Sequence, residues 1–283
     1  MNKAILEKIK NDESVYEKTL ESIARHIVDN KQIKVILIAG GSCAGKTTTT
    51  KKLSILIADY GRKAYTVSLD DYYRNLDESV YLPDGTRDIE SINSLRTDLI
   101  RESLGDILEG REAKIPMFDF KTKSRTDDYR RIKLSDGEVV LVEGLHALDP
   151  QLFDKCPDEN AVYRVYLYAD AGDGTDCRFV RRMVRDARHR NADAEQTYTL
   201  WDNVKKNEYA SIEPFGNTAD VTINTFFPYE RAILNDDAIF QLNTVLPESS
   251  HYESARELIT VLEPYEQFTD DYVPTNSLLR EFI

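Results

Sequence analysis

At 283 residues, the chain is long enough to bury a sizeable core in one large α/β domain. Its 50 acidic and 37 basic residues give a net charge of −13, which disfavours nonspecific binding to nucleic acid or to anionic membranes and favours a small-molecule substrate. Three widely spaced cysteines indicate neither a disulfide framework nor a metal cluster, and no segment approaches the roughly 20 apolar residues of a membrane span, so we expect a soluble protein of the reducing cytoplasm.

Apolar periodicity divides the chain into three expected regions. Residues 1–30 place apolar side chains among charges at helical spacing, which predicts an amphipathic helical region. Residues 31–228 contain short apolar runs separated by helical patterns, an alternation typical of a doubly wound, mainly parallel α/β sheet with helices on both faces. Residues 229–283 add helical patterns and a tail, which we expect to pack on that domain or on a partner subunit. The expected strands are 35–39, 64–69, 139–142, 162–168 and 221–223, and the expected C-terminal helices are 229–242 and 252–262.

A phosphate-binding pattern follows the first expected strand. It matches G-x-x-x-x-G-K-[ST] completely, and its residues are Gly40, Gly41, Ser42, Cys43, Ala44, Gly45, Lys46 and Thr47. In such a loop, glycines let backbone N–H groups close around a polyphosphate, the lysine neutralises its charge and the final hydroxyl can bind Mg²⁺. A helix is expected over 46–59, so Thr48 joins the loop in our expected site for ATP or GTP. A glycine-rich turn that binds nothing would have no need of Lys46 and Thr47.

Two of the expected strands end in carboxylates. Asp70 follows the second strand, where it can act as a base that takes the proton from a substrate hydroxyl while helping to hold Mg²⁺. The alternative is that Asp70 and Asp71 cap the next helix. Glu143 ends the third strand in the place of a Walker-B acid and would bind Mg²⁺ directly or through water, unless it is a solvated strand end. We expect the nearby His146 to be structural.

An insertion of about 71–137 separates the second and third expected strands. It contains an expected helix near 92–108 and a polar stretch around 121–133. Insertions at the carboxyl ends of strands usually build substrate sites. Four aromatic side chains of these strand-end segments can either stack on a planar base or pack in the core, and they are Tyr72, Tyr73, Phe118 and Phe120.

An arginine-rich segment stands out in this acidic chain. Its six arginines are Arg178, Arg181, Arg182, Arg185, Arg188 and Arg190. Forked guanidinium groups match phosphate oxygens, so a helix that carries them can close over a nucleotide and stabilise the charge of phosphoryl transfer. A solvated basic face would explain an isolated run of charges equally well. Because the same chain carries a phosphate loop, we favour an arginine-rich helical lid at about 173–195.

These motifs together resemble the uridine kinase and phosphoribulokinase family of P-loop kinases. Besides the phosphate loop, the strings that carry the resemblance are Ser68-Leu-Asp-Asp-Tyr-Tyr73, Ile115-Pro-Met-Phe-Asp-Phe120 with Ser124-Arg125, Val142-Glu-Gly144 and Arg181-Arg-Met-Val-Arg-Asp186. The resemblance covers about 33–224 and implies a P-loop NTPase-type fold with an inserted substrate-binding segment. Asp88-Ile-Glu90 and the closing residues 276–283 look closer to a bacterial subgroup whose longer members carry an N-terminal module like that of threonyl-tRNA synthetase. That module has no counterpart in these 283 residues.

The resemblance implies a role for each motif. Asp70 would be the base acting on a nucleoside 5′-hydroxyl, and Thr47, Asp70 and Glu143 would surround Mg²⁺. The other implied contacts are Tyr73 and Arg182 with the nucleoside, and Arg185 and Arg190 with the phosphates as parts of the lid.

Several positions of the acceptor site depart from the family pattern. Glu90 stands where uridine-cytidine kinases have the aspartate expected to hold the ribose hydroxyls. Phe118 and Lys123 replace their base-reading tyrosine and histidine, and Ala192 and Leu200 align with a further arginine and glutamine. These changes leave phosphoryl transfer intact but leave the preferred base and sugar open.

Our leading hypothesis is a Mg²⁺-dependent nucleoside 5′-kinase of the uridine kinase type, which transfers the γ-phosphate of ATP or GTP to a pyrimidine nucleoside. Its expected catalytic residues are Lys46, Asp70, Arg182 and Arg185, and its expected substrate contacts are Asp70, Tyr73, Glu90, Phe118, Phe120, Lys123 and Arg182. One alternative is a thymidine or deoxynucleoside kinase. Another is a phosphoribulokinase-like or pantothenate-kinase-like enzyme, since Lys121, Lys123 and Arg125 could favour an anionic acceptor. The last is a protein that binds NTP without transferring phosphate. The resemblance is compatible with a homo-oligomer.

Overall fold

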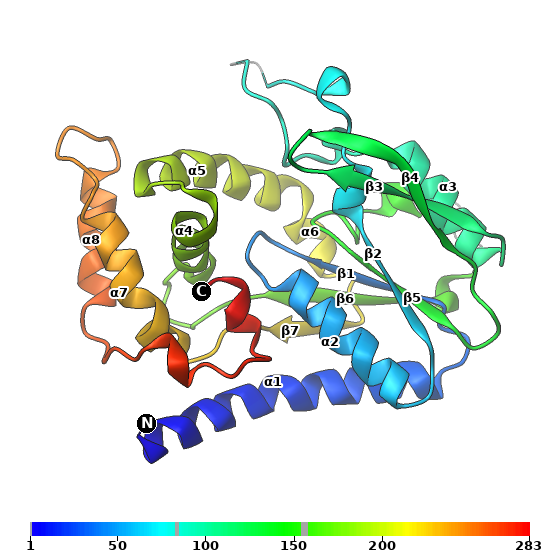
Figure 1. Ribbon diagram of the computed structural model, residues 1–283, viewed down its shortest axis with the longest axis horizontal. Coiled ribbons are helices and arrows are strands. Elements are labelled where there is room, and N and C mark those ends of the chain that lie inside the picture. Colours follow the sequence, from blue (N-terminus) through cyan, green and yellow to red (C-terminus); the bar gives the residue numbers. More distant parts are fainter. Residues whose placement is uncertain (1, 83–84, 154–157) are drawn as a thin grey trace.

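The centre of the molecule is a five-stranded parallel sheet (Figure 1). The computed structural model describes residues 2–82, 85–153 and 158–283. The strand order is β2-β5-β1-β6-β7, and every neighbouring pair is parallel. The strands of this sheet are β1 (Val35–Gly40), β2 (Ala64–Ser68), β5 (Val139–Glu143), β6 (Val162–Tyr168) and β7 (Val221–Asn224). The predicted parallel α/β sheet is therefore confirmed.

The sheet buries both of its faces. All residues of β1 and β5 are buried, as expected of apolar strands covered on both sides. Because side chains alternate along a strand, Ile36 and Ile38 join the apolar core on one face, while Val35 and Leu37 join the core on the other.

Helices cover each face of the sheet. The long helix α1 packs against α2, and both contribute side chains to the same apolar core as α4, α5, α7 and α8. Helix α3 and a two-stranded sheet cover the opposite face (Figure 1). The helices are α1 (Lys3–Asp29), α2 (Lys46–Asp59), α3 (Thr97–Leu108), α4 (Cys177–Arg190), α5 (Ala194–Ser211), α6 (Glu213–Gly216), α7 (Glu230–Leu242) and α8 (Tyr252–Leu262).

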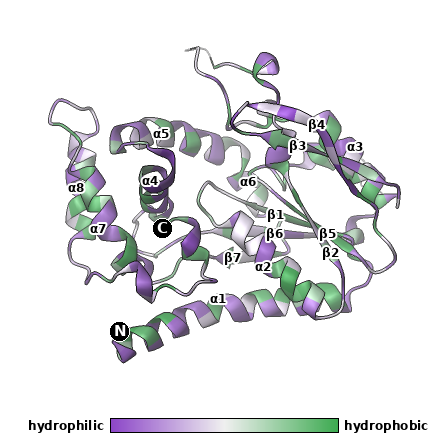
Figure 2. Ribbon diagram, in the orientation of Figure 1, coloured by the Kyte–Doolittle hydropathy of each residue, from purple (hydrophilic) through white to green (hydrophobic). Residues whose placement is uncertain are grey.

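The insertion contains a β-hairpin that the sequence analysis did not predict. Strands β3 (Ala113–Asp119) and β4 (Ser124–Ile132) pair in antiparallel register. Most of β4 is exposed and charged, and Figure 2 colours it largely as hydrophilic, so the polar stretch at 121–133 lacked the apolar alternation by which a strand is usually recognised. The predicted helix at 92–108 begins later, at Thr97, and 92–94 form a separate 3₁₀ turn.

The C-terminal segment returns to the middle of the molecule after α8. It ends in a short 3₁₀ helix, Leu278–Glu281, which lies near the start of α2 (Figure 1). One apolar cluster contains residues from α1, the sheet and this segment. The division into 1–30, 31–228 and 229–283 stays a prediction.

Two observations bear on the environment of the protein. Among the described residues, none of the helices has the length and apolar character needed to cross a membrane. Cys43 and Cys177 are buried free thiols, and Cys156 lies outside the described residues. The cytoplasmic location stays a prediction.

Candidate active site

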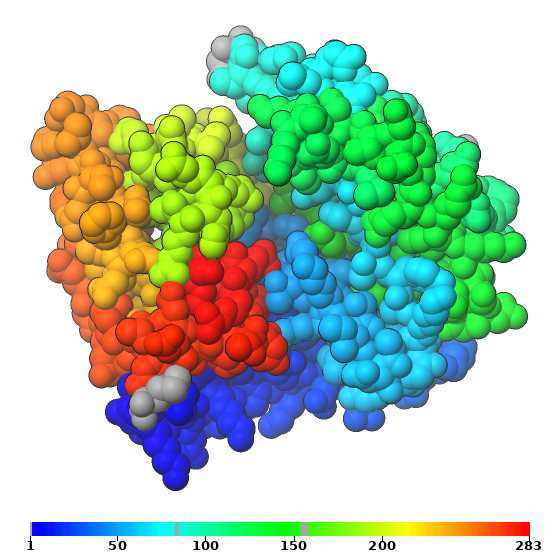
Figure 3. Space-filling view, viewed as in Figure 1, coloured from blue at the N-terminus to red at the C-terminus, as the bar shows by residue number. Residues whose placement is uncertain are grey.

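A cavity of about 540 Å³ opens at the carboxyl edge of the sheet. Figure 3 shows the surface hollowed between the insertion, in cyan and green, and the yellow-green and red parts of the C-terminal half. The cavity collects most of the residues singled out from the sequence: Ser42, Cys43, Gly45, Lys46, Thr47, Asp70, Tyr73, Glu90, Phe118, Phe120, Lys123, Glu143, Arg182, Arg185 and Arg190. Four other predicted nucleotide-binding residues do not line it, and they are Gly40, Gly41, Ala44 and Thr48.

The phosphate loop connects β1 to α2 at one end of this cavity. Gly45 precedes the first turn of α2 in a left-handed conformation, with φ of 81°, which glycine adopts without strain. The Lys46 amine donates a hydrogen bond to the carbonyl of Gly41 at 2.9 Å, so the lysine lies across its own loop. The first N–H groups of a helix have no partner within the helix, and those of α2 begin at this loop.

An ion pair braces the loop from outside the cavity. The Glu208 carboxylate on α5 accepts two hydrogen bonds from Arg178, at 2.7 and 2.8 Å, and one from the backbone N–H of Ser42 at 2.8 Å. Burial acts to raise the pKa of Glu208, but the hydrogen bonds and charge of Arg178, together with the N–H of Ser42 and the charge of Lys205, lower that pKa overall. A Cβ atom at Gly41 would clash with the Arg178 guanidinium and the Glu208 carboxylate, so a larger residue at this position would displace the ion pair.

Two carboxylates stand at neighbouring strand ends in the cavity. Glu143, the last residue of β5, pairs in register with Ser68 of β2 and accepts a hydrogen bond from its hydroxyl at 2.7 Å. Asp70 lies in the turn that follows β2, where its carboxylate is open to the cavity yet lies deep among protein atoms. Burial raises the pKa of both carboxyl groups, and the positive charge of Lys46 opposes that rise.

The helix-capping alternative for Asp70 and Asp71 is wrong. The Ser68 hydroxyl caps the turn by accepting a hydrogen bond from the N–H of Asp70. Asp71 instead accepts hydrogen bonds from the N–H of Phe118 at 3.4 Å and from Arg130 at 3.0 Å, and thereby ties the turn to the β-hairpin.

Hard oxygen ligands suited to a magnesium ion face the phosphate end of the cavity. Thr47 is exposed and lines the cavity together with Asp70 and Glu143. No group of three or more His, Cys, Asp or Glu side chains among the described residues could hold a metal ion by itself. Mg²⁺ commonly binds through one or two carboxylates, substrate phosphates and retained waters, so these residues fit an ion that arrives with a nucleotide.

An aromatic group forms another part of the cavity lining. Tyr73, Phe118 and Phe120 have ring centroids 5.1 to 6.3 Å apart. Phe120 is 61% exposed and lines the cavity, so core packing does not explain it, whereas Tyr72 is buried in the core. The Tyr73 hydroxyl donates to the carbonyl of Ile89 at 2.9 Å.

Glu90 is held in the cavity through its main chain. Its carbonyl accepts hydrogen bonds from the His146 ring at 2.8 Å and from the Asn207 amide at 2.7 Å. Burial raises the pKa of the Glu90 carboxyl group, and the charge of Arg182 opposes that rise. His146 is 97% buried and hydrogen-bonded, in agreement with the predicted structural role.

The arginines of α4 differ in their surroundings. Those that line the cavity are Arg182, Arg185 and Arg190. All three form ion pairs with buried Asp186, at 3.3, 2.7 and 3.5 Å, so one carboxylate orients them together. Arg188 instead pairs with Asp237 and Asp270 at the surface. The solvated-face alternative is wrong, because Arg178, Arg181 and Arg182 are buried.

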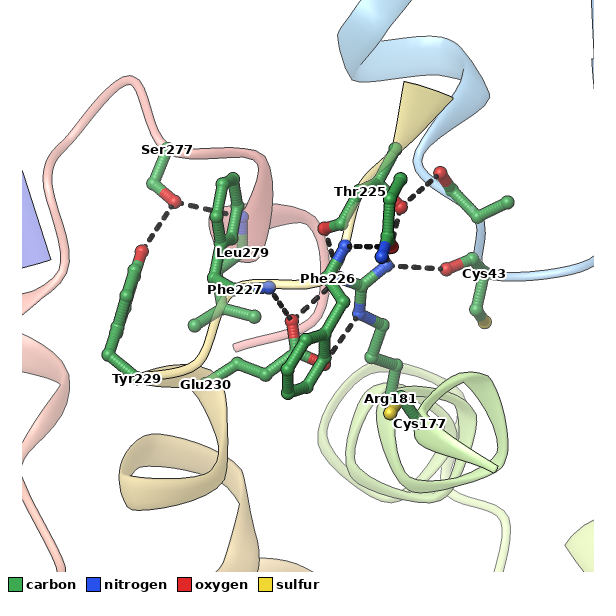
Figure 4. Close-up of polar contacts among 12 residues, drawn as sticks. Cys43, Cys177, Arg181, Thr225, Phe226, Phe227, Tyr229, Glu230, Ser277 and Leu279 are labelled. Carbon is green, nitrogen blue, oxygen red and sulfur yellow. Dashed lines mark hydrogen bonds and ion pairs between the residues drawn. The ribbon is translucent and has the colours of Figure 1, made fainter. Parts of the chain in front are cut away.

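Arg181 forms a fully buried network beneath the phosphate loop (Figure 4). Its guanidinium group donates to both carboxylate oxygens of Glu230, to the carbonyl of Cys43, and to the hydroxyl and carbonyl of Thr225. These five contacts use all five of its N–H donors. The arginine therefore holds the loop, α4 and the start of α7 in fixed positions.

Sequence reasoning missed several residues that line the cavity or brace the phosphate loop. The missed cavity residues are Arg87, Ile89, Leu145 and Glu281. Ile89 lies inside the string Asp88-Ile-Glu90, and Arg87 and Leu145 directly adjoin quoted motifs, so local sequence could have pointed to these three residues. Glu208 and Glu281 carry no local signal, because only the fold brings them to the loop.

Comparison with known proteins settles the family. The sequence pattern described as the phosphoribulokinase / uridine kinase family matches residues 35–228. The chain belongs to this family. It is 27% identical over 197 residues to a uridine kinase of Ureaplasma parvum, which covers 69% of this chain and 90% of that protein. It is 26% identical over 223 residues to uridine-cytidine kinase 2-B of Danio rerio, with 72% and 82% covered.

A solved structure supports the fold alone. The D-glycerate 3-kinase from Cryptococcus neoformans var. grubii superimposes with a TM-score of 0.52 over 71% of this chain and 89% of that one, at 12% identity. Family membership and the curated relatives make this chain a nucleotide-binding P-loop kinase, a phosphotransferase that acts on the hydroxyl group of a small molecule.

Proposed function

We propose that the chain is a nucleoside 5′-kinase of the uridine kinase type, with ATP or GTP as phosphate donor and a pyrimidine nucleoside as acceptor. The supporting observation is the position of Asp70. Its charge interacts with Lys46 of the phosphate loop and with Tyr73 of the aromatic group, and all three line one cavity. Asp70 is therefore close enough to interact both with the phosphate loop, where the donor would bind, and with the aromatic group, where the acceptor would bind.

In this proposal each charged group has a distinct task. Asp70 accepts the proton of the acceptor hydroxyl as that oxygen attacks phosphorus. Lys46, Arg182 and Arg185 stabilise the negative charge on the transferred group from fixed positions. Mg²⁺, held by Thr47 with Asp70 and Glu143 nearby, would neutralise charge on the donor phosphates.

The acceptor end suits a flat base attached to a sugar. The faces of Tyr73, Phe118 and Phe120 can stack on a base, and Glu90 offers a carboxylate to sugar hydroxyls. Relatives that are uridine kinases support a nucleoside.

A second candidate, a kinase for an anionic acceptor such as a sugar phosphate, is favoured by Arg87 and Lys123, which line the same cavity. Lys121 and Arg125 do not line it, and Arg125 is bound to Glu78 and to the carbonyl of Tyr73.

A substrate panel tests the proposal. Purified protein is incubated with Mg²⁺, ATP or GTP and one acceptor at a time, drawn from ribonucleosides, deoxynucleosides including thymidine, sugar phosphates and pantothenate. We expect the fastest transfer to a pyrimidine nucleoside. Transfer only to an anionic acceptor would establish the second candidate, and nucleotide binding without transfer to any acceptor would overturn both.

A matched pair of variants tests the base. Asp70→Asn is expected to lower kcat by about 10²- to 10⁴-fold while nucleotide affinity is kept, since general-base catalysis contributes about that much. Asp71→Asn changes the adjacent carboxylate, which does not line the cavity, and is expected to keep most of the activity. Full activity of the Asp70 variant would show that another group takes the proton.

A further inference from the structure

The C-terminal segment, residues 277–283, is built into the phosphate end of the site. Leu278, Leu279 and Phe282 are fully buried. Leu278 packs on the phosphate loop so closely that a Cβ atom at Gly45 would lie 2.4 Å from its Cδ1 atom. The Phe282 ring lies 5.1 Å from the guanidinium group of Arg181, the residue that also holds the loop. The segment is thus a wall of the loop and not a loose end.

Polar contacts fix the position of this segment from both sides. The Ser277 hydroxyl accepts a hydrogen bond from the N–H of Leu279 and lies 3.0 Å from the Tyr229 hydroxyl (Figure 4). The Tyr229 hydroxyl in turn donates to Glu13 of α1 at 2.6 Å. Arg280 donates to main-chain carbonyls that precede the segment, including that of Asp270 at 3.1 Å.

These contacts place the carboxylate of Glu281 beside the nucleotide-binding residues. It accepts a hydrogen bond from the Thr48 hydroxyl at 2.7 Å and lines the cavity together with Lys46 and Thr47. Its negative charge acts on Glu143, whose pKa is raised mainly by burial and further by this charge, and on Arg185. The motif analysis assigned no role to this residue.

A carboxylate at this place has opposite effects on two forms of a nucleotide. It repels the phosphates of a metal-free nucleotide that bind at Lys46 and at the start of α2. It attracts a Mg²⁺ ion near Thr47 and can accept hydrogen bonds from the waters that Mg²⁺ keeps. The charge of Glu281 therefore discriminates between the two forms.

We propose that Glu281 is a positioning residue of the donor site, which makes nucleotide binding selective for the magnesium-bound form. This inference rests on the proposed function, in which the cavity binds a nucleoside triphosphate. It assigns the C-terminal segment to the donor site, although the segment lies far beyond the stretch that matches the family.

Binding calorimetry without any acceptor tests the inference. The Kd of ATP is measured in Mg²⁺ and in EDTA. The ratio of the Kd in EDTA to the Kd in Mg²⁺, which measures the preference for the magnesium-bound form, is then compared between proteins. In Glu281→Gln the charge is lost while an amide oxygen can still accept from Thr48, so we expect weaker binding in Mg²⁺, tighter binding in EDTA and a ratio about tenfold smaller. Glu281→Ala is expected to reduce the ratio similarly, and Glu281→Asp to keep it near that of the wild type.

A matched control and three outcomes complete the design. Glu266→Gln removes an exposed carboxylate from the preceding stretch, outside the cavity, and is expected to leave the ratio unchanged. Equal losses of affinity in Mg²⁺ and EDTA would show that Glu281 only holds the fold, and unchanged affinities would show that it has no role; either result overturns the inference alone. A wild-type protein that binds neither ATP nor GTP in either buffer would overturn the proposed function as well.

Discussion

At the scale of single residues, position decides what a carboxylate can do. Asp70, Glu90 and Glu143 line one cavity, and burial raises the pKa of each. Glu208 is buried outside the cavity, yet its pKa is lowered, because Arg178 binds it in bidentate fashion. A raised pKa makes the carboxylate of each of these three residues a stronger base than an ordinary one, and this direction suits the proposed role of Asp70.

The raised pKa of Asp70 predicts the pH dependence of the reaction. A base must be ionised to accept a proton, so kcat/KM for the acceptor should fall as the pH drops through the folded-state pKa. Because burial raises that pKa, the fall should lie above about 3.9, the ordinary value for an aspartate. The measurement is kcat/KM against pH at saturating donor. Glu90→Gln should keep the acidic limb; its disappearance in that variant would assign the limb to Glu90.

At the scale of elements, the arginines of α4 have different partners, although they look alike in the sequence. Arg178 and Arg181 brace the phosphate loop, and Arg182 and Arg185 face the cavity. Arg188 forms ion pairs at the surface. The helix is buried along most of its length, and Asp186 holds the side chains of Arg182 and Arg185 that it presents to the cavity.

Two arginines of α4 should differ sharply in their effect on stability. Arg181→Gln leaves the Glu230 carboxylate buried without its partner and should lower the free energy of unfolding by about 3–5 kcal/mol. Arg188→Gln breaks surface pairs and should cost about 0–1 kcal/mol. Urea denaturation of both variants checks this, and Arg181→Lys serves as a milder variant. Similar losses for Arg181→Gln and Arg188→Gln would contradict the assigned roles.

At the scale of the whole molecule, distant parts of the chain build the two ends of the site. The phosphate loop is braced by Glu208 of α5 and by the C-terminal segment. The aromatic end of the cavity, the proposed acceptor end, belongs mainly to the insertion, but Asn207 of α5 binds the main chain of Glu90 within it. Helix α5 thus contacts both ends of the cavity.

Removal of the link between α5 and the insertion should affect the acceptor selectively. Asn207→Ala deletes one of two hydrogen bonds to the Glu90 carbonyl and should raise the KM of the acceptor by about three- to tenfold, with the KM of the donor unchanged. Asn203→Ala, one turn earlier on the exposed side of α5, is the matched control and should change neither constant. Steady-state kinetics with each substrate varied gives both values, and a parallel rise in both would refute the selective effect.

Local patterns predicted much of the fold but not its least apolar part. The strands of the parallel sheet were visible as apolar runs, because a strand that is covered on both faces consists almost entirely of apolar residues. Strand β4 was missed because its exposed charges follow no period, and its extended form comes from pairing with β3. The partners of the α4 arginines were equally hidden, since the carboxylates of Glu208 and Glu230 come from other helices.

The sequence by itself determined the donor chemistry, the family and the candidate base, because the loop at 40–47 and the carboxylates at strand ends are local features with fixed spacing. The tertiary structure decided which arginines face the cavity, how Glu90 is held and that Glu281 stands beside the phosphate loop. The physical reason is the range of the interactions. Backbone conformation and phosphate binding follow from neighbours in sequence, whereas burial, ion pairing and electrostatic influence depend on residues that only folding brings together.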